Sequence, residues 1–216
     1  MARWRDLLET GPKALRIAVV GAGAGGVELA MAMKFALAGR GEVALFSDRF
    51  PFRPGVARRI QNALASLSIP LRLEALPDAA FDAAFWVTGA TPLPMLRDSA
   101  LRKDAGGFVL VDPALRSVSH PDVFAAGDCA SLEGAEVPKS GVYAVRQGAV
   151  LAQNLKRIVR GMPMLDYTPQ SASLSLISCG AKYAIASRGK WSGEGRWAWW
   201  WKNWIDRRWL RRLRAS

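Results

Sequence analysis

Residues 15–40 read LRIAVVGAGAGGVELAMAMKFALAGR, and this stretch decides the fold. Leu15–Val20 is a mostly aliphatic, β-rich run that leads directly into glycines. Residues 27–37 then continue with residue types that favour helices. The stretch therefore predicts a strand, a tight turn and a helix, in that order.

The same alternation continues as far as residue 88. Gly39 and Gly41 end the first helix, because glycine is a poor helix former. We expect further strands at residues 43–46, 69–73 and 85–88, and a second helix at residues 56–67. Strands that alternate with helices indicate an α/β fold with a parallel, doubly wound sheet covered on both faces.

The rest of the chain predicts a second α/β unit, then a hairpin and a final helix. The expected elements are strands at residues 108–111 and 123–126, a helix at 141–160, hairpin strands at 172–178 and 183–187, and a Trp- and Arg-rich helix at 197–213. These elements divide the chain into three regions, residues 1–88, 89–162 and 163–216.

Size and composition indicate a globular protein. The chain has 216 residues, of which 50% are hydrophobic, so it can bury a sizeable core. Residues 1–12 mix charges of both signs and do not resemble a secretory signal, and no apolar stretch reaches the length of a membrane span. We therefore expect a cytoplasmic protein.

The cysteines and the histidine offer no catalytic group. Cys129 and Cys179 lie far apart in the sequence, so neither a redox pair nor a zinc site is predicted. His120 is the only histidine and precedes a proline in a turn, which argues against triad chemistry. We predict no metal site and assign no catalytic side chain.

The glycine turn has the spacing that a dinucleotide pyrophosphate needs. Gly21 would make the tight turn, Gly23 would let the ligand approach the backbone, and Gly26 would let helix and strand pack closely. The helix that follows offers free N–H groups and the positive end of its dipole to a phosphate. The alternative is a structural glycine turn without a ligand.

Asp48 lies 22 residues after Gly26, at the end of the second predicted strand. Its carboxylate is placed to accept hydrogen bonds from a ribose 2′-OH, which would favour NADH. Arg49 beside it would instead suit the 2′-phosphate of NADPH, and a solvated loop carboxylate is the third interpretation.

Residues 119–130 read SHPDVFAAGDCA and are similar to a sequence motif of a known protein family. The string resembles the C-terminal flavin motif of the pyridine nucleotide-disulfide oxidoreductases and the type II NADH dehydrogenases. In those families the Gly-Asp pair that closes the strand binds the ribityl or phosphate part of FAD. The resemblance implies that Gly127 and Asp128 do so here, with NAD(P)H as the second cofactor. A capped turn with a solvated Asp128 is the alternative.

Other strings extend the resemblance over residues 16–212. Residues 137–142 resemble the loop onto a helix whose N-terminus points at the flavin, and a helix dipole there would stabilise reduced flavin. Residues 88–92 resemble the crossover between the two domains. The resemblance implies a cofactor-binding role for Glu28, near the nicotinamide, and for Gly89, Lys139, Gly141 and Val142. Gln147 would lie on the acceptor side, although a solvated glutamine is the favoured interpretation.

The C-terminal third is similar to the branch of this family that also occurs fused to selenide, water dikinase. The strings concerned lie at residues 174–178, 184–189 and 201–208. Two departures stand out. The glycine turn that holds the ADP half of FAD has no counterpart before residue 16, and residues 74–85 leave no room for the β-meander of the nicotinamide domain. The resemblance thus implies a shortened Rossmann-like domain and part of a flavin domain. Either the chain is a truncated product, or a partner chain or a homodimer supplies the rest.

The last 29 residues are strongly basic. They carry +7 of the formal +12 charge, and in the final helix one face holds Trp197, Trp200, Trp201, Trp204 and Ile205, a combination that suits a peripheral position on a membrane surface. Packing on a missing domain or second subunit is the alternative, and nucleic acid is not expected because no reading module is present. We hypothesise an FAD-dependent NAD(P)H oxidoreductase that reduces a quinone-like or other acceptor. The competing hypothesis is a catalytically incompetent dinucleotide-binding remnant whose tail binds a membrane or a partner.

Overall fold

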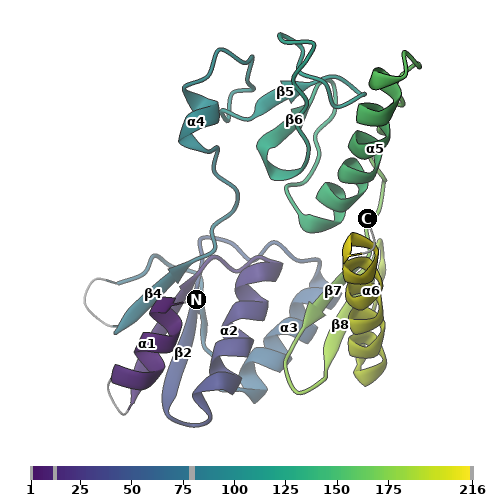
Figure 1. Cartoon of the computed structure of the whole chain (residues 1–216). Helices are drawn as coiled ribbons and strands as arrows, with labels where there is room; N and C mark the ends of the chain where they lie inside the picture. The colour runs from purple at the N-terminus through teal and green to yellow at the C-terminus, as the bar shows by residue number, and fades with distance from the viewer. Residues whose placement is uncertain (1, 12–13, 78–80, 215–216) are drawn as a thin grey trace. The chain divides into compact units, whose positions relative to one another are not determined.

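The computed structural model describes residues 2–11, 14–77 and 81–214, and these form two compact units (Figure 1). The first unit joins Met1–Thr88 to Leu174–Ser216, and the second is Gly89–Ser173. Residues 163–216 are predicted from the sequence to be a separate region. In the structure, Leu174–Ser216 lie in the same unit as the glycine turn.

A parallel sheet forms the centre of the first unit. Its strands are β1 (Leu15–Val20), β2 (Gly41–Phe46), β3 (Leu71–Arg72) and β4 (Ala83–Trp86), in the order β3-β2-β1-β4. Val20, the last residue of β1, pairs with Phe46 and with Trp86, so the carboxyl ends of three strands share one edge. The predicted parallel α/β sheet is confirmed.

Helices cover one face of this sheet. They are α1 (Ala2–Thr10), α2 (Ala24–Leu37) and α3 (Pro54–Ser66), and Figure 1 shows α2 and α3 lying along the strands. The main core contains Ile17 and Leu45 from the sheet, Met31 from α2 and Ile60 from α3, all fully buried. Burying such a side chain contributes about 1.5–3 kcal/mol, so this layer dominates the stability of the unit.

The second face of the sheet lacks a helix among the described residues. Phe46 is fully buried there, with the ring of Phe81 edge-on to it at 5.4 Å, and Leu76 and Ala84 complete the cluster. Phe81 and Leu76 belong to the short connection between β3 and β4. The doubly wound pattern is therefore reduced on this face, because a connection of ten residues cannot form a helical crossover.

Three antiparallel strands and a long helix complete the first unit. β7 (Ser175–Ser178), β8 (Ala184–Arg188) and β9 (Trp191–Gly195) form a meander, and α6 (Arg196–Arg214) packs on it (Figure 1). The hairpin is confirmed, while β9, with two glycines in WSGEG, was not predicted. Ile177 and Ile185 join the core beneath α2, which makes this segment part of the nucleotide unit.

The second unit contains little regular structure. Its elements are α4 (Pro94–Arg97), β5 (Val109–Val111), the 3₁₀ turn Gly127–Cys129, β6 (Ala130–Leu132) and α5 (Gly141–Val159). β5 and β6 pair in parallel, and the expected strand at residues 123–126 is wrong. Those residues fold back on Leu115 and Ser117 through isolated backbone bonds, and the strand begins only after the Gly-Asp turn.

Candidate functional site: a glycine turn at the carboxyl edge of a parallel sheet

Gly21 and Gly26 interlock at the end of β1. Gly21 has a φ of +112°, and its N–H donates to the Phe46 carbonyl oxygen at 2.7 Å. A Cβ atom on Gly26 would overlap the Gly21 carbonyl oxygen, and one on Gly21 would overlap the Val87 carbonyl oxygen. These two positions therefore admit only glycine, because no backbone atom there can move without breaking the sheet edge.

Gly23 differs from its two partners, since a Cβ atom built on it would meet nothing within 4 Å. The space around it is open to solvent, as are Ala24 and Gly25 at the start of α2. First-turn amides of a helix have no carbonyl partner within the helix, so they point into this open space. The turn thus presents donors and a helix dipole to an anion without any basic side chain.

Asp48 lies two residues beyond β2, on the same edge of the sheet as the glycine turn. Its side chain and that of Arg49 are both exposed. The buried Ser47 hydroxyl lies 3.4 Å from Asp48 Oδ1 and 3.4 Å from the Arg49 amide, which holds this corner together. The corner offers a carboxylate and a guanidinium, so both cofactor preferences weighed from the sequence remain predictions.

Glu28 is already engaged by the C-terminal segment. One carboxylate oxygen, Oε1, accepts the Ser178 N–H at 2.7 Å and lies 3.4 Å from Lys202 Nζ of α6. A second link is the 2.5 Å ion pair between Arg59 of α3 and Glu194 of β9. The sequence offers no signal for these long-range contacts. Glu28 therefore connects the helix after the glycine turn to the β-meander and to α6.

The Gly-Asp motif forms a tight turn in the second unit. Gly127 has a φ of +75°, and its N–H donates to Gln147 Oε1 of α5 at 2.5 Å. Gln147 is only 4% exposed, so the expectation of a solvated glutamine is wrong. Asp128, next in the turn, is exposed. Gln147 is the residue whose importance the sequence understated, because a buried amide anchors the turn that carries Asp128.

Lys139 points back into the unit instead of outward. Its ammonium donates to the Ala130 carbonyl oxygen and lies 4.1 Å from the centre of the Phe108 ring. Burial lowers the pKa of Lys139, and the nearby carboxylates of Asp104 and Asp128 oppose that shift. In this arrangement Lys139 holds the loop that leads into α5 against Ala130 and Phe108. A role of Lys139 in cofactor binding stays a prediction.

The start of α5 is open. Ser140, the residue before the helix, makes no hydrogen bond from its side chain to the helix amides, and Gly141 and Val142 are exposed. Gly89, the remaining predicted site residue, is also exposed, and a Cβ atom there would meet nothing within 4 Å. A small pocket connects the turn to the helix start and is lined by Gly127, Asp128, Lys139, Ser140, Tyr143 and Gln147.

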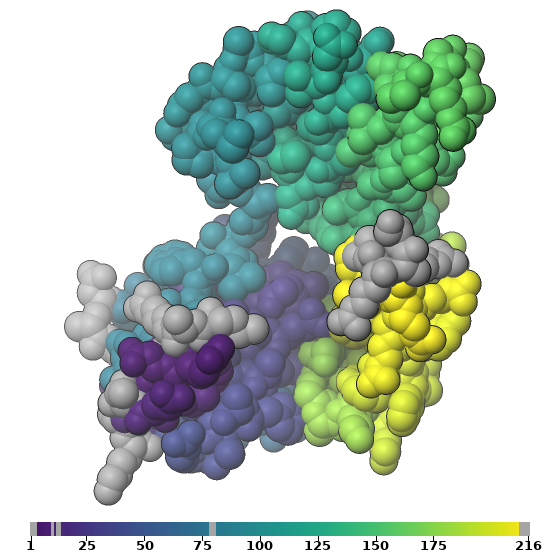
Figure 2. Space-filling view, viewed as in Figure 1, coloured from purple at the N-terminus to yellow at the C-terminus, as the bar shows by residue number. Residues whose placement is uncertain are grey.

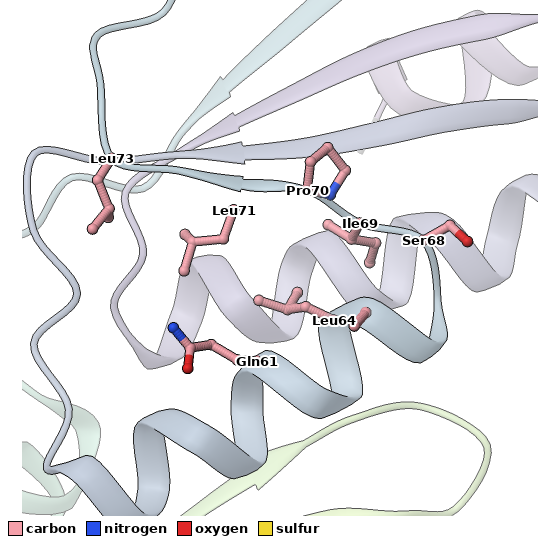
Figure 3. A pocket seen from close by; sticks show the side chains of 8 residues that line it. Gln61, Leu64, Ser68, Ile69, Pro70, Leu71 and Leu73 are labelled. Atoms are coloured by element: carbon pink, nitrogen blue, oxygen red, sulfur yellow. The ribbon is translucent and has the colours of Figure 1, made fainter.

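A different pocket lies at the outer edge of the sheet, between α3 and β3 (Figure 3). Its lining is mostly apolar, with Leu64, Ile69, Leu71 and Leu73, and it contains no titratable side chain. None of the predicted site residues contributes to it. Within the described part of the chain, no group of His, Cys, Asp and Glu is arranged to hold a metal ion.

A parallel sheet with an open glycine turn at its carboxyl edge is the arrangement typical of the Rossmann-like class of dinucleotide-binding folds. The chain belongs to the pyridine nucleotide-disulphide oxidoreductase family, which matches residues 3–148. The members of this family are oxidoreductases that use FAD and NAD(P)H. No described helix is both long and apolar enough to cross a membrane.

Individual relatives match over parts of their length. The demethylphylloquinone reductase NdbB of Synechocystis sp. is 27% identical over 205 residues, which cover 82% of this chain and 50% of the relative. The nitric oxide reductase FlRd-NAD(+) reductase of Salmonella arizonae is 31% identical over 153 residues, or 58% of this chain and 38% of the relative. The chain thus spans at most half the length of these relatives.

Solved structures share the fold. The NAD-dependent persulfide reductase from A. fulgidus superposes with a TM-score of 0.68 at 20% identity, covering 87% of this chain and 38% of that one. LpdA from Mycobacterium tuberculosis gives a TM-score of 0.58 at 17% identity, covering 85% and 42%. At such identities the likeness supports the Rossmann-like fold of the chain.

Proposed function

We propose that this chain is the nicotinamide-binding part, and one portion of the flavin-binding part, of an FAD-dependent NAD(P)H oxidoreductase. The observation that carries the proposal is the glycine turn, in which Gly21 and Gly26 interlock while Gly23 stays open. Packing alone requires glycine at positions 21 and 26. At position 23 the packing would accept a side chain, whereas a bound pyrophosphate needs that space.

The residues of this chain would bind and orient, and the cofactor would supply the chemistry. The amides at the start of α2 would hold the pyrophosphate, and Asp48 or Arg49 would contact the adenosine ribose. Gly127, Asp128 and the open start of α5 at Gly141 and Val142 fit the ribityl chain and the pyrimidine edge of a flavin. FAD, when bound, takes hydride from the nicotinamide and passes electrons to a quinone-like or other acceptor.

The rest of the FAD site would come from a second glycine turn, supplied by a partner or by further sequence of the same protein. The second unit has an open surface for such a complement. α5 exposes Val142, Val145, Leu155 and Val159 to solvent, and β5 and β6 form a sheet of only two parallel strands. Parallel sheets are normally buried on both faces, so this half-domain gains stability from completion.

Calorimetric titration with NADH and NADPH tests the nucleotide site. Saturable binding of at least one of them is expected, and Asp48→Asn should weaken NADH binding several-fold if the carboxylate contacts the ribose. Asp98→Asn is the matched control, because Asp98 is also exposed but lies in the other unit. Absence of saturation with either nucleotide would refute the proposed site.

A visible spectrum separates the enzyme from its competitor. Flavin bands that NADH bleaches, either in the chain as purified or after mixing with FAD and an FAD-binding partner domain, support the oxidoreductase. A protein that binds NADH but stays colourless in both cases would instead be a dinucleotide-binding remnant.

A further inference from the structure

Residues 188–190, Arg-Gly-Lys, connect β8 to β9 and are here named the basic turn. Gly189 adopts a left-handed backbone with a φ of +58°, and its carbonyl oxygen accepts a hydrogen bond from Arg53 Nη1 at 3.0 Å. Arg53 directly precedes α3. Figure 2 shows the C-terminal segment, in light green and yellow, lying against the rest of the first unit. The basic turn is thus held at the amino end of α3.

Two further contacts fix where the basic turn lies in the fold. Ser192 of β9 is beside Gly55 in the first turn of α3, since a Cβ atom on Gly55 would lie 3.5 Å from Ser192 Oγ. Glu194, further along β9, pairs with Arg59, one turn further along α3. The strand therefore follows the helix from its amino end onward, and the turn that precedes the strand lies beyond that end.

The topology of the sheet places this end of α3 beside the glycine turn. α3 connects the parallel strands β2 and β3, so it runs antiparallel to them and begins at the carboxyl edge of the sheet. The glycine turn and Asp48 lie at that same edge. The basic turn, which the sequence places 136 residues after Arg53, therefore reaches the edge where the adenosine half of a dinucleotide binds.

The groups brought together at this edge are mostly cationic. The connection between β2 and α3 contributes Asp48, Arg49 and Arg53, and the basic turn adds Arg188 and Lys190. All five side chains are exposed, and four cations with one carboxylate give these groups a formal net charge of +3. The first turn of α3 has no acidic residue, so its dipole adds positive potential. A ribose 2′-OH would need only the carboxylate, whereas a phosphate gains from each cation.

We propose that these four cations form a site for the 2′-phosphate of NADPH, to which the C-terminal meander contributes Arg188 and Lys190. The inference rests on the proposed nucleotide site and names the cofactor that the site prefers. The bond to Gly189 takes one of the five N–H groups of Arg53, so its guanidinium retains donors for a phosphate. Asp48 would oppose the phosphate, and it would therefore lower the affinity for NADPH.

Calorimetric titration of the whole chain tests the proposal without any flavin. NADPH should bind about tenfold more tightly than NADH, because the 2′-phosphate adds charge-assisted hydrogen bonds. The same preference should separate 2′,5′-ADP from ADP, which locates it at the adenosine end. It should shrink as salt rises, since salt screens exposed charges. Inorganic phosphate should compete much more weakly than 2′,5′-ADP.

Paired variants assign the preference to the basic turn. Arg188→Ala with Lys190→Ala should lower the affinity for NADPH about fivefold and that for NADH less than twofold, because only the 2′-phosphate loses partners. Arg40→Ala with Lys182→Ala is the matched control, since it removes the same two charges from exposed positions at the opposite edge of the same unit. Thermal denaturation would verify that each variant is folded.

Asp48→Asn provides a second test with a change of sign. Removing the carboxylate should strengthen NADPH binding, because the 2′-phosphate loses a repulsive neighbour, and it should weaken NADH binding. A folded Asp48→Asn variant that binds NADPH less tightly would contradict the proposed phosphate site.

Four other results would overturn the proposal. Equal affinities for NADH and NADPH would reject the phosphate site and leave the proposed nucleotide site intact, whereas failure of both to bind would reject the two together. An equal loss of NADPH affinity in the control pair would reduce the effect to overall charge. Competition by inorganic phosphate as strong as that by 2′,5′-ADP would mean that the cations bind any anion.

Discussion

At the scale of single residues, the glycine turn separates two reasons for keeping a glycine. At Gly26 the neighbouring backbone leaves no room for a side chain, so the fold needs glycine there. At Gly23 the surroundings are open, so only a ligand would need it. The two positions therefore predict different consequences of the same substitution.

Gly26→Ala should destabilise the chain, and Gly23→Ala should not. Overpacking typically costs about 1–3 kcal/mol, and the rigid sheet edge at Gly21 places Gly26→Ala at or above the upper end. Gly23→Ala should keep the melting temperature but weaken NADH binding by about tenfold or more. Thermal denaturation and calorimetry would measure both, with Gly148→Ala, at another open glycine, as the control. A stable Gly26→Ala variant would contradict the packing argument.

Cys179 predicts a pH-dependent reactivity. Burial raises the pKa of the Cys179 thiol to about 12, with Glu194 and Glu28 adding to the effect. At pH 8 the folded protein therefore holds about one thiolate in ten thousand at this position, and thiolate is the reactive form. Labelling should accelerate as the pH approaches 12.

A thiol-reactive dye would check this in Cys129→Ser, which leaves Cys179 as the only cysteine. The folded variant should label negligibly at pH 8 and completely in urea. Cys179→Ser, which keeps the half-buried Cys129, serves as the comparison. Rapid labelling of folded Cys129→Ser at pH 8 would show that the thiol is not buried.

At the scale of elements, one side chain fastens α5 to the loops around it. Asn154 is fully buried, and its amide donates to the carbonyl oxygens of Ala114 and Leu165 at 2.9 Å each. Its Oδ1 accepts the Leu165 N–H at 2.8 Å. The side chain thus satisfies three backbone groups that are otherwise removed from water.

Asn154→Leu should therefore lower the free energy of unfolding of the second unit by about 2–4 kcal/mol, because buried backbone groups lose their partners. Gln153→Leu, at the exposed neighbouring position on α5, should change it by less than about 0.5 kcal/mol. Urea denaturation followed by circular dichroism would measure both. Equal effects would mean that α5 is held by its apolar contacts alone.

At the scale of the whole molecule, the C-terminal segment completes the core of the nucleotide unit. Ile177 and Ile185 are 2% and 0% exposed and lie in the same cluster as Val27 and Met31 of α2. Glu28 and Arg59 reinforce that contact through Ser178, Lys202 and Glu194. The basic helix α6 is thus held against the unit near its N-terminal end, and its outer face is exposed to solvent.

A chain ended after Ser173 should lose cooperative unfolding of the nucleotide unit and should expose apolar surface. A chain ended after Asp206 should keep its melting temperature, because Ala198 and Lys202 remain. Calorimetry and binding of a hydrophobic dye would compare the two. If the shorter chain unfolded as cooperatively as the longer one, the segment would be an appendage.

The local elements were largely predictable from the sequence. The run into Gly21 predicted β1 and α2, since a glycine turn between strand and helix residues has few other solutions, and residues 141–160 predicted α5. The expectation of a strand at residues 123–126 failed because a run of only four apolar residues pairs with whichever partner the tertiary fold provides. β9 went unpredicted because glycine-rich strands carry little intrinsic preference.

The sequence by itself determined the glycine turn, the parallel sheet and the membership of an oxidoreductase family, because local spacing encodes these features. Only the tertiary structure decided which glycine is open, that Gln147 is buried against Gly127, and that Glu28 binds Ser178 and Lys202. These are contacts between residues 20 to more than 150 positions apart along the chain, and the packing of whole elements brings them together.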